Sequence, residues 1–345
     1  MTRGACNRTS SFGRALSLCV LAVAIVPAIS FPADGQSYKY FRLGNPEDAH
    51  TNPVRGYALM GGGSDLDEAF KWLCDRASGG DFLVLRAHGD DDYNSYIKSL
   101  CKANSVATLI LPDRAAAQDP KVAEIIRHAE AIFIAGGDQA KYLNFWAGTP
   151  VQKEINNALA RGVPLGGTSA GLAVMGEFVY SAQGDAPDDP GLTSVLALSN
   201  PFHPRVTVRR AFLAISILKN TLTDTHFKAR DRMGRSLTFL SRIVQDGWSA
   251  HPREIAVDEK TAVLLDPEGK AIVVGKSTVY FMEVTEAPAV CRVEESLTIS
   301  GVSVYRLGPG GHFDMAKWRG RGGVSYSLSV DKGVVHSTAA GGAIY

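Results

Sequence analysis

The segment Gly167-Thr168-Ser169-Ala170-Gly171 has the spacing of a nucleophile elbow. In a G-x-S-x-G turn the serine lies on a sharp bend between a strand and a helix, where flanking side chains would clash. An apolar stretch precedes this segment and a second one follows it, as that geometry requires. Free N–H groups at the start of the helix favour negative charge beside Ser169. A helix-capping serine in a plain turn is the alternative; the flanking strand and helix favour the nucleophile.

A serine nucleophile needs a base within hydrogen-bond reach. His226 follows the run Thr-Leu-Thr-Asp and precedes an arginine-rich stretch, which places it at the end of a predicted strand. His128 falls late in a predicted helix, just before a strand begins, and so belongs to the opposite edge of the sheet. His226 is therefore the expected base, with His88 and His203 as its rivals.

Two glycines at Gly136-Gly137-Asp138-Gln139 follow another predicted strand. Glycine lets the backbone approach a ligand closely, so the Gly137 N–H can supply half of an oxyanion hole. The Ala170 N–H would supply the other half. An ordinary turn between a strand and a helix is the alternative.

An arginine cluster lies near His226, and a carboxylate precedes that histidine. Arginine guanidiniums bind carboxylates with two parallel hydrogen bonds, so a cluster beside a base can hold a substrate carboxylate or a peptide terminus. A solvated basic helix is the commoner explanation of such a run. The residues are Asp224, Arg230, Arg232 and Arg235.

The elements that must position these residues alternate between strands and helices. Apolar strands are predicted at Phe82–Ala87, Val106–Leu111 and Ala131–Gly137, with amphipathic helices between them. Fully apolar strands in this order predict an α/β fold whose mainly parallel sheet is sandwiched by helices. Functional residues of such sheets gather at the carboxyl ends of the strands, where the glycine motifs and Ser169 fall.

The chain divides into three expected parts. Residues 1–30 have three arginines, an apolar run and small residues before a cleavage position, which is the layout of a secretory signal peptide. An uncleaved membrane anchor is the alternative, but the apolar run is short for a membrane span. Residues 31–250 form the α/β domain. Residues 251–345 contain short strands separated by glycine and proline turns, a β-rich C-terminal section. Export predicts a secreted or periplasmic protein.

Composition limits the partners. The 345 residues carry a formal net charge of +1, which gives no electrostatic reason to expect nucleic acid or a membrane surface. Outside the leader the cysteines are Cys74, Cys101 and Cys291. In an oxidising compartment one pair and one free thiol can form, and the sequence does not choose the pair. Buried, unpaired thiols are the equally weighted alternative.

Taken together, GGTSAG at 166–171, GGDQ at 136–139 and DTHFKARDRMGR at 224–235 resemble the cyanophycinase and aspartyl dipeptidase family of serine peptidases. The resemblance implies a class I glutamine amidotransferase-like fold, with Ser169 as nucleophile and His226 as base. It places Gly137 in the oxyanion hole and assigns Gln139, Asp224, Arg230, Arg232 and Arg235 to the substrate site. The implied substrate is an aspartyl peptide, including the polymer with arginines on a polyaspartate backbone. It implies no metal and no organic cofactor, and a homodimer is an open expectation.

One departure from the family concerns the acid that orients the histidine. Relatives commonly carry Glu or Asp before an Ala-Leu pair between serine and histidine, where this chain reads Thr193-Ser194-Val195-Leu196-Ala197-Leu198. Asp185 is the nearest candidate, ahead of Asp188 and Asp189. A missing acid would leave a weak enzyme that binds peptides or a protein partner. An α/β-hydrolase esterase is disfavoured by the β-rich section after His226, and a glutamine amidotransferase by serine in place of cysteine.

Overall fold

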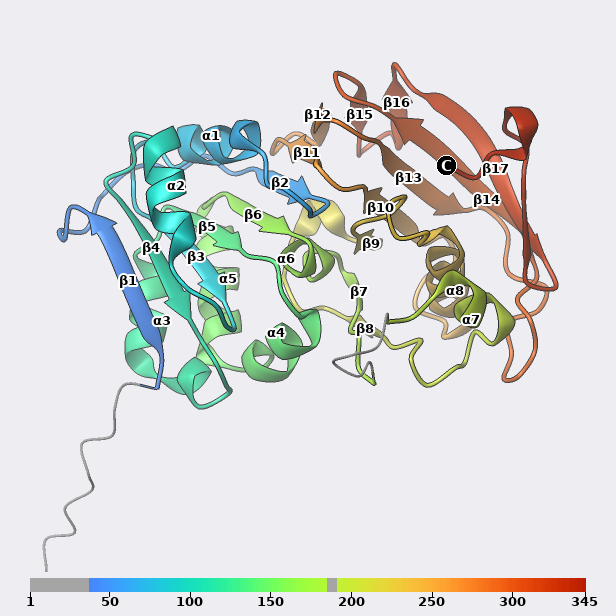
Figure 1. Cartoon of the computed structure of the whole chain (residues 1–345), viewed down its shortest axis with the longest axis horizontal. Helices are drawn as coiled ribbons and strands as arrows, with labels where there is room; N and C mark the ends of the chain where they lie inside the picture. Colours follow the sequence, from blue (N-terminus) through green and yellow to red (C-terminus); the bar gives the residue numbers. More distant parts are fainter. Residues whose placement is uncertain (1–36, 185–190) are drawn as a thin grey trace, which may run out of the picture. The chain divides into compact units, whose positions relative to one another are not determined.

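The strands of the protein form two sheets, which the computed structural model describes over residues 37–184 and 191–345 (Figure 1). In this part of the chain the first sheet has ten strands and the second has eight. The strands of the first sheet are β1 (Lys39–Gly44), β2 (Tyr57–Met60), β3 (Phe82–Arg86), β4 (Ser105–Ile110), β5 (Ala131–Ile134), β6 (Leu165–Thr168), β11 (Thr261–Leu265), β12 (Lys270–Gly275), β15 (His312–Asp314) and β16 (Arg319–Arg321).

The first sheet has the order β1-β4-β3-β5-β6-β2-β11-β12-β15-β16. Strands β4, β3, β5, β6 and β2 pair in parallel. Antiparallel strands extend the sheet on both sides, with β1 beside β4 and β11 beside β2. The parallel arrangement predicted from the apolar strands is therefore present in the middle of the sheet, and the sheet as a whole is mixed.

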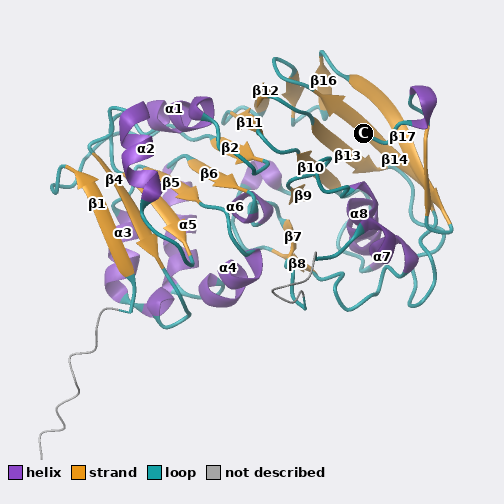
Figure 2. Cartoon of the chain, viewed as in Figure 1, coloured by secondary structure: helices purple, strands orange, loops and turns teal. Residues whose placement is uncertain are grey.

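Helices cover both faces of the parallel strands, because alternate side chains of a strand point to opposite faces. Leu83 and Leu85 of β3 pack in one core with Ile126, whereas Val84 packs in another core with Phe70. Figure 2 shows helices on both sides of these strands. The helices around this sheet are α1 (Asp67–Arg76), α2 (Asp92–Leu100), α3 (Pro120–Arg127), α4 (Gln139–Trp146), α5 (Pro150–Arg161) and the short α6 (Ala170–Ala173).

A disulfide joins two of these helical segments. Cys74 in α1 is bonded to Cys101, which directly follows α2, and Cys291 is free and buried. The structure thus chooses the pair that the sequence left open. None of the helices in the described residues is long and apolar enough to cross a membrane.

The second sheet has the order β18-β17-β14-β13-β10-β9-β7-β8. Helices α7 (Ser194–Ser199) and α8 (Met233–Gln245) pack against it. Strands β7, β9 and β10 are parallel, and the remaining pairings are antiparallel. The strands are β7 (Phe178–Tyr180), β8 (Val208–Arg210), β9 (Thr221–Asp224), β10 (Arg253–Val257), β13 (Val279–Val284), β14 (Ile299–Leu307), β17 (Val324–Asp331) and β18 (Val334–Ser337).

The two sheets meet through the connection between β10 and β11. Strand β10 belongs to the second sheet and β11 to the first, so the turn Asp258-Glu259-Lys260 passes from one to the other. Ile255 of β10 and Val263 of β11 lie in the same hydrophobic core. The residues after position 250 therefore contribute strands to both sheets, and this turn lies beside the carboxyl ends of β2 and β9.

Candidate active site

Ser169 lies on a strained turn between β6 and α6. Its φ is 52° and its ψ is −118°, values that a residue with a side chain rarely adopts. A Cβ on Gly171 would meet the carbonyl oxygen of Ile134 at 2.0 Å, and one on Gly167 would meet Gly171 at 2.6 Å. Both glycines of G-x-S-x-G are therefore required by close backbone approach, as the spacing predicts.

His226 comes from the other sheet and reaches Ser169 directly. The hydroxyl of Ser169 donates to Nε2 of His226 at 2.7 Å, and Nδ1 of His226 donates to Oε1 of Glu259 at 2.6 Å. His226 is buried, with 5% of its surface exposed. Its backbone N–H bonds to the carbonyl of Gly61 at 2.8 Å, so the end of β9 is held against the loop after β2.

Gly62 explains how the serine and histidine come so close. Its φ is +93°, and an added Cβ would lie 2.5 Å from the imidazole of His226 and 3.1 Å from Cβ of Ser169. Any side chain at this position would occupy the space where the two catalytic groups meet. Gly62, which follows β2, thus has a packing role in the site.

Glu259 is the acid on His226, and reasoning from the sequence missed it. The acid was expected between serine and histidine in the chain, whereas Glu259 follows the histidine, in the turn between β10 and β11. Strand β10 runs parallel to β9, with Ala256 opposite Asp224, so the two strands end at the same edge. Asp185 lies outside the described residues, and its predicted role stays a prediction.

The surroundings of His226 favour its neutral form. Burial lowers the pKa of His226; the hydrogen bond to Glu259 raises it, and the charges of Arg230 and Arg232 lower it, with a net shift below the ordinary histidine value. A neutral imidazole with its proton on Nδ1 leaves Nε2 free to accept the proton of Ser169. This is the protonation state that a general base needs.

Backbone of the Gly136-Gly137 segment lies against the nucleophile. A Cβ on Gly136 would be 3.6 Å from Cβ of Ser169, and Ala170 is the first residue of α6. The N–H groups predicted for an oxyanion hole therefore come from segments that adjoin Ser169. His88 lies beside Gly137 instead, where its ring would be 3.1 Å from an added Cβ.

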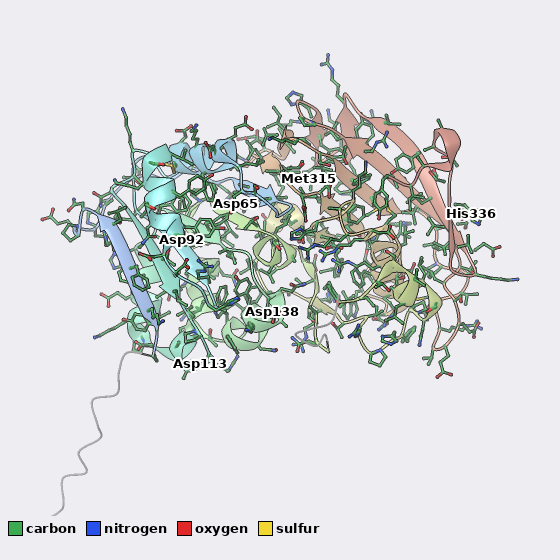
Figure 3. All side chains as sticks on the ribbon, in the orientation of Figure 1. Asp65, Asp92, Asp113, Asp138, Met315 and His336 are labelled. Atoms are coloured by element: carbon green, nitrogen blue, oxygen red, sulfur yellow. A yellow bond between two sulfur atoms is a disulfide. The ribbon has the colours of Figure 1, made fainter. Side chains whose placement is uncertain are left out.

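Gln139 opens helix α4 immediately after this segment. Asp138, labelled in Figure 3, caps the helix by accepting from the Ala140 N–H at 2.8 Å. Gln139 is half-buried. This cap determines where α4 begins. It therefore also determines the position of Gln139 relative to Gly136 and Gly137.

The three arginines have different environments. Arg235 is buried and binds both oxygens of Asp224, through Nε at 2.9 Å and through Nη2. Arg232 donates to the carbonyl of Thr225 at 2.9 Å and lies 3.5 Å from Asp224. Arg230 is half exposed, with its Nε 3.8 Å from Oε1 of Glu259.

All three arginines line one pocket of about 460 Å³, together with residues at the start of α7 and Asp231. Burial and the charge of Arg235 lower the pKa of Arg232 to about 9. Arg230 connects the pocket to the histidine through Glu259. The predicted substrate residues Arg230, Arg232 and Arg235 therefore share a cavity, whereas Asp224 is not part of its lining and pairs with Arg232 and Arg235.

No group of three or more His, Cys, Asp or Glu residues in the described ranges is arranged to hold a metal ion. The chemistry available to this site is that of a hydroxyl, an imidazole, a carboxylate and guanidiniums.

Comparisons with known proteins identify related peptidases. Residues 86–205 match the model of peptidase family S51. The chain is 30% identical to a cyanophycinase of Geminocystis herdmanii over 220 residues, which are 61% of this chain and 72% of that enzyme. It is 28% identical to a cyanophycinase of Thermosynechococcus vestitus over 217 residues, 61% of this chain and 60% of that enzyme. The match thus spans less than two thirds of the second relative.

A solved peptidase from an acI-B1 Actinobacterium has a similar fold, with a TM-score of 0.50 at 18% identity. The match covers 76% of this chain and 98% of that one. The relatives define the class of the protein as a peptidase. More narrowly, the chain belongs to peptidase family S51, the cyanophycinase family. The resemblance seen in its three motifs is confirmed.

Proposed function

We propose that the protein is a serine-type peptidase that hydrolyses aspartyl peptides through an acyl-enzyme on Ser169. The observation that carries this proposal is the continuous contact from Ser169 Oγ to His226 Nε2 and from His226 Nδ1 to Glu259, at 2.7 and 2.6 Å. A hydroxyl, a base and an acid that orients the base are the parts of a catalytic triad, which is recognised by geometry rather than by chain order.

In the proposed reaction, Ser169 Oγ attacks the scissile carbonyl while its proton passes to Nε2 of His226. Glu259 stabilises the imidazolium that forms. The N–H groups of Gly137 and Ala170 bind the oxyanion of the tetrahedral intermediate. His226 then gives the proton to the leaving amine, the C–N bond breaks, and the acyl group stays on Ser169. Water, activated by the same histidine, releases it.

The arginine pocket supports a substrate that carries a carboxylate. Arg230 is half exposed at the edge of this pocket and close to Glu259, so it can meet a carboxylate that approaches Ser169. The relatives are cyanophycinases, and the family resemblance extends the candidate substrates to β-linked aspartate–arginine polymer and to aspartyl dipeptides. No metal and no organic cofactor takes part in the proposed reaction.

The test is incubation of the purified protein with the arginine–aspartate polymer and with a panel of α- and β-aspartyl dipeptides. Products are identified by mass, and Ser169→Ala is the control. We expect release of aspartyl products by the wild-type protein only. Equal product release by the Ser169→Ala protein, or no hydrolysis of any member of the panel, would contradict the proposal.

The alternative of a catalytically weak binding protein rested on the missing acid. Contact of Glu259 with His226 removes that reason, so we favour the enzyme. The glutamine amidotransferase-like description of the fold is part of the proposal. Its support is the parallel set of strands with helices on both faces and the strained serine at the end of β6.

We further propose that the protein is exported and acts in a secreted or periplasmic setting. Residues 1–30, where the signal peptide is predicted, lie outside the described residues. Support comes from the Cys74–Cys101 disulfide, because disulfides persist in oxidising compartments and are rare in the cytosol. Sequencing the amino terminus of the protein recovered from its source should find cleavage near residue 30; an intact Met1 would contradict export.

A further inference from the structure

Three buried polar side chains form a line behind the arginine pocket. Asp224 ends β9, Glu254 lies on β10 and Ser236 lies on α8, and their exposed surfaces are 2%, 0% and 0%. Ser236 Oγ is 2.6 Å from Oε1 of Glu254 and 3.4 Å from Oδ2 of Asp224. A single hydroxyl thus lies between two carboxyl groups.

The number of protons available at the Ser236 hydroxyl determines whether Asp224 and Glu254 can both be ionised. A serine hydroxyl has one proton, and an ionised carboxylate has none to donate. Ser236 can therefore bond to both groups only if one of them is a neutral acid. The arrangement that uses every proton has Glu254 donating to Ser236 Oγ and Ser236 donating to Asp224.

The neutral member is Glu254. Asp224 receives hydrogen bonds from both arms of Arg235 and from the Thr225 N–H. Oε2 of Glu254 is buried and has no hydrogen-bond partner among the described residues. An unpaired buried charge is far more costly than an unpaired neutral oxygen.

The pKa shifts agree with this assignment. Burial and the charge of Asp224 raise the pKa of Glu254 well above its usual range. Burial opposes ionisation of Asp224 as well, but the charges of Arg235 and Arg232 outweigh it and lower the pKa of Asp224. One carboxylate and two guanidiniums leave one positive charge in excess beside the pocket, and ionised Glu254 would cancel that excess.

We propose that Glu254 is a specificity-determining positioning residue: as a neutral acid it preserves the excess positive charge of the arginine pocket for a substrate carboxylate. This inference rests on the proposed function of the pocket and adds a residue that touches neither Ser169 nor substrate. Other groups around Glu254 are Asp224 on β9, Arg235 and Ser236 on α8, and the apolar Met282 opposite it on β13.

The test compares the wild-type protein with Glu254→Gln, which is neutral at every pH and nearly isosteric. The KM for an Asp-containing dipeptide and for its Asn counterpart is measured at pH 7, where Arg232 is charged. Glu283→Gln is the matched control, because Glu283 is a half-buried carboxylate on the adjacent strand whose partner is Arg253, at 2.8 Å.

At pH 7 we expect the same KM for Glu254→Gln and the wild-type protein, within about twofold. The Asn peptide should show no difference between the two proteins, and Glu283→Gln should follow the wild type. If Glu254 were ionised, removing its charge in Glu254→Gln would lower the KM for the Asp peptide on the order of tenfold, since a buried charge near the site acts through a low effective dielectric. Such a drop at pH 7 would overturn the proposal.

Infrared spectroscopy gives a second measurement that needs no substrate. The wild-type protein at pH 7 should show the carbonyl band of one neutral carboxylic acid that Glu254→Gln lacks and Glu283→Gln keeps. If the wild-type protein hydrolyses no acidic peptide, the proposed function fails while this band still decides the state of Glu254. Glu254→Met provides a second neutral variant if Glu254→Gln does not fold.

Discussion

The nucleophile side and the arginine side of the site are built by different physical means. Around Ser169 the positions are set by backbone: a strained serine, glycines that admit no Cβ, and N–H groups at the start of α6. Around Asp224 they are set by buried charge, with Arg232 and Arg235 held by one carboxylate. In the proposed function, the first side supplies the reaction and the second selects the substrate.

This difference matters for how each side tolerates change. Backbone geometry leaves little room, because even a methyl group at Gly62 would meet the histidine ring. A network of charges can lose one member and keep its shape, provided that no buried charge is left alone. Substitutions on the nucleophile side should therefore reduce kcat, and exposed substitutions on the arginine side should act on KM.

The largest effect is expected for Ser169→Ala. Loss of the hydroxyl should reduce kcat/KM for aspartyl peptides on the order of 10³-fold or more, because the nucleophile is removed from an otherwise unchanged turn. Far-ultraviolet circular dichroism and the melting temperature should match the wild type. Hydrolysis at a near wild-type rate would place the nucleophile elsewhere.

Glu259→Gln should have the next largest effect, a loss of kcat of roughly 10² to 10⁴ with little change in KM. An amide can stabilise the wrong histidine tautomer and cannot support the imidazolium. Asp185→Asn is the matched variant, since it makes the same change at the acid expected from the sequence. If Asp185→Asn is the crippling change and Glu259→Gln is not, the orienting acid lies between serine and histidine after all.

Asp185 and Glu259 show which part of the site the sequence could not predict, namely the acid that contacts His226. Ser169, His226 and the parallel strands are readable because each depends on a local pattern: a glycine turn, a strand end, an apolar run. Glu259 depends on a long-range fact, the parallel pairing of β10 with β9. The residues after position 250 were expected to form a β-rich section, either a subdomain or an antiparallel extension of the main sheet. Neither expectation places the end of β10 among the strand ends that meet at the site.

Gly62→Ala tests the backbone side without removing any catalytic group. The added methyl must displace the His226 ring or shift the loop, and φ of +93° is itself unfavourable for alanine. We expect kcat to fall about 10²-fold, as for a catalytic group misplaced by about 1 Å. Gly247→Ala is the control, because Gly247 also has positive φ but nothing lies within 4 Å of its added Cβ. Wild-type kcat in Gly62→Ala would show that the space beside His226 is not limiting.

On the arginine side, Arg230→Ala should raise KM for an Asp peptide roughly tenfold, the cost of one hydrogen bond to a charged group. The KM for the Asn counterpart should change less, and kcat should stay near the wild type. Lys228→Ala removes a nearby exposed cation and should have no effect on either KM. Equal losses for both peptides would mean that Arg230 does not recognise the carboxylate.

The smallest effect connects the two sides, since Arg230 also acts on the histidine. The base must be neutral, so kcat/KM should rise with pH through the pKa of His226 in the free enzyme. Burial and the charges of Arg230 and Arg232 hold that pKa below the ordinary histidine value, against the opposing effect of Glu259. The wild-type enzyme should therefore stay active at a lower pH than an ordinary histidine base would allow.

Arg230→Ala removes one of the charges that lower the pKa of His226 and leaves Glu259 without the guanidinium 3.8 Å away. Both changes favour the imidazolium, so the acid limb should move to higher pH, and a rate measured on that limb should fall a few-fold. The rate of labelling by a small uncharged serine-reactive probe reports this shift without any carboxylate contact, and Lys228→Ala should leave the limb in place. A limb that does not move in Arg230→Ala would show that the charges selecting the substrate act independently of the base.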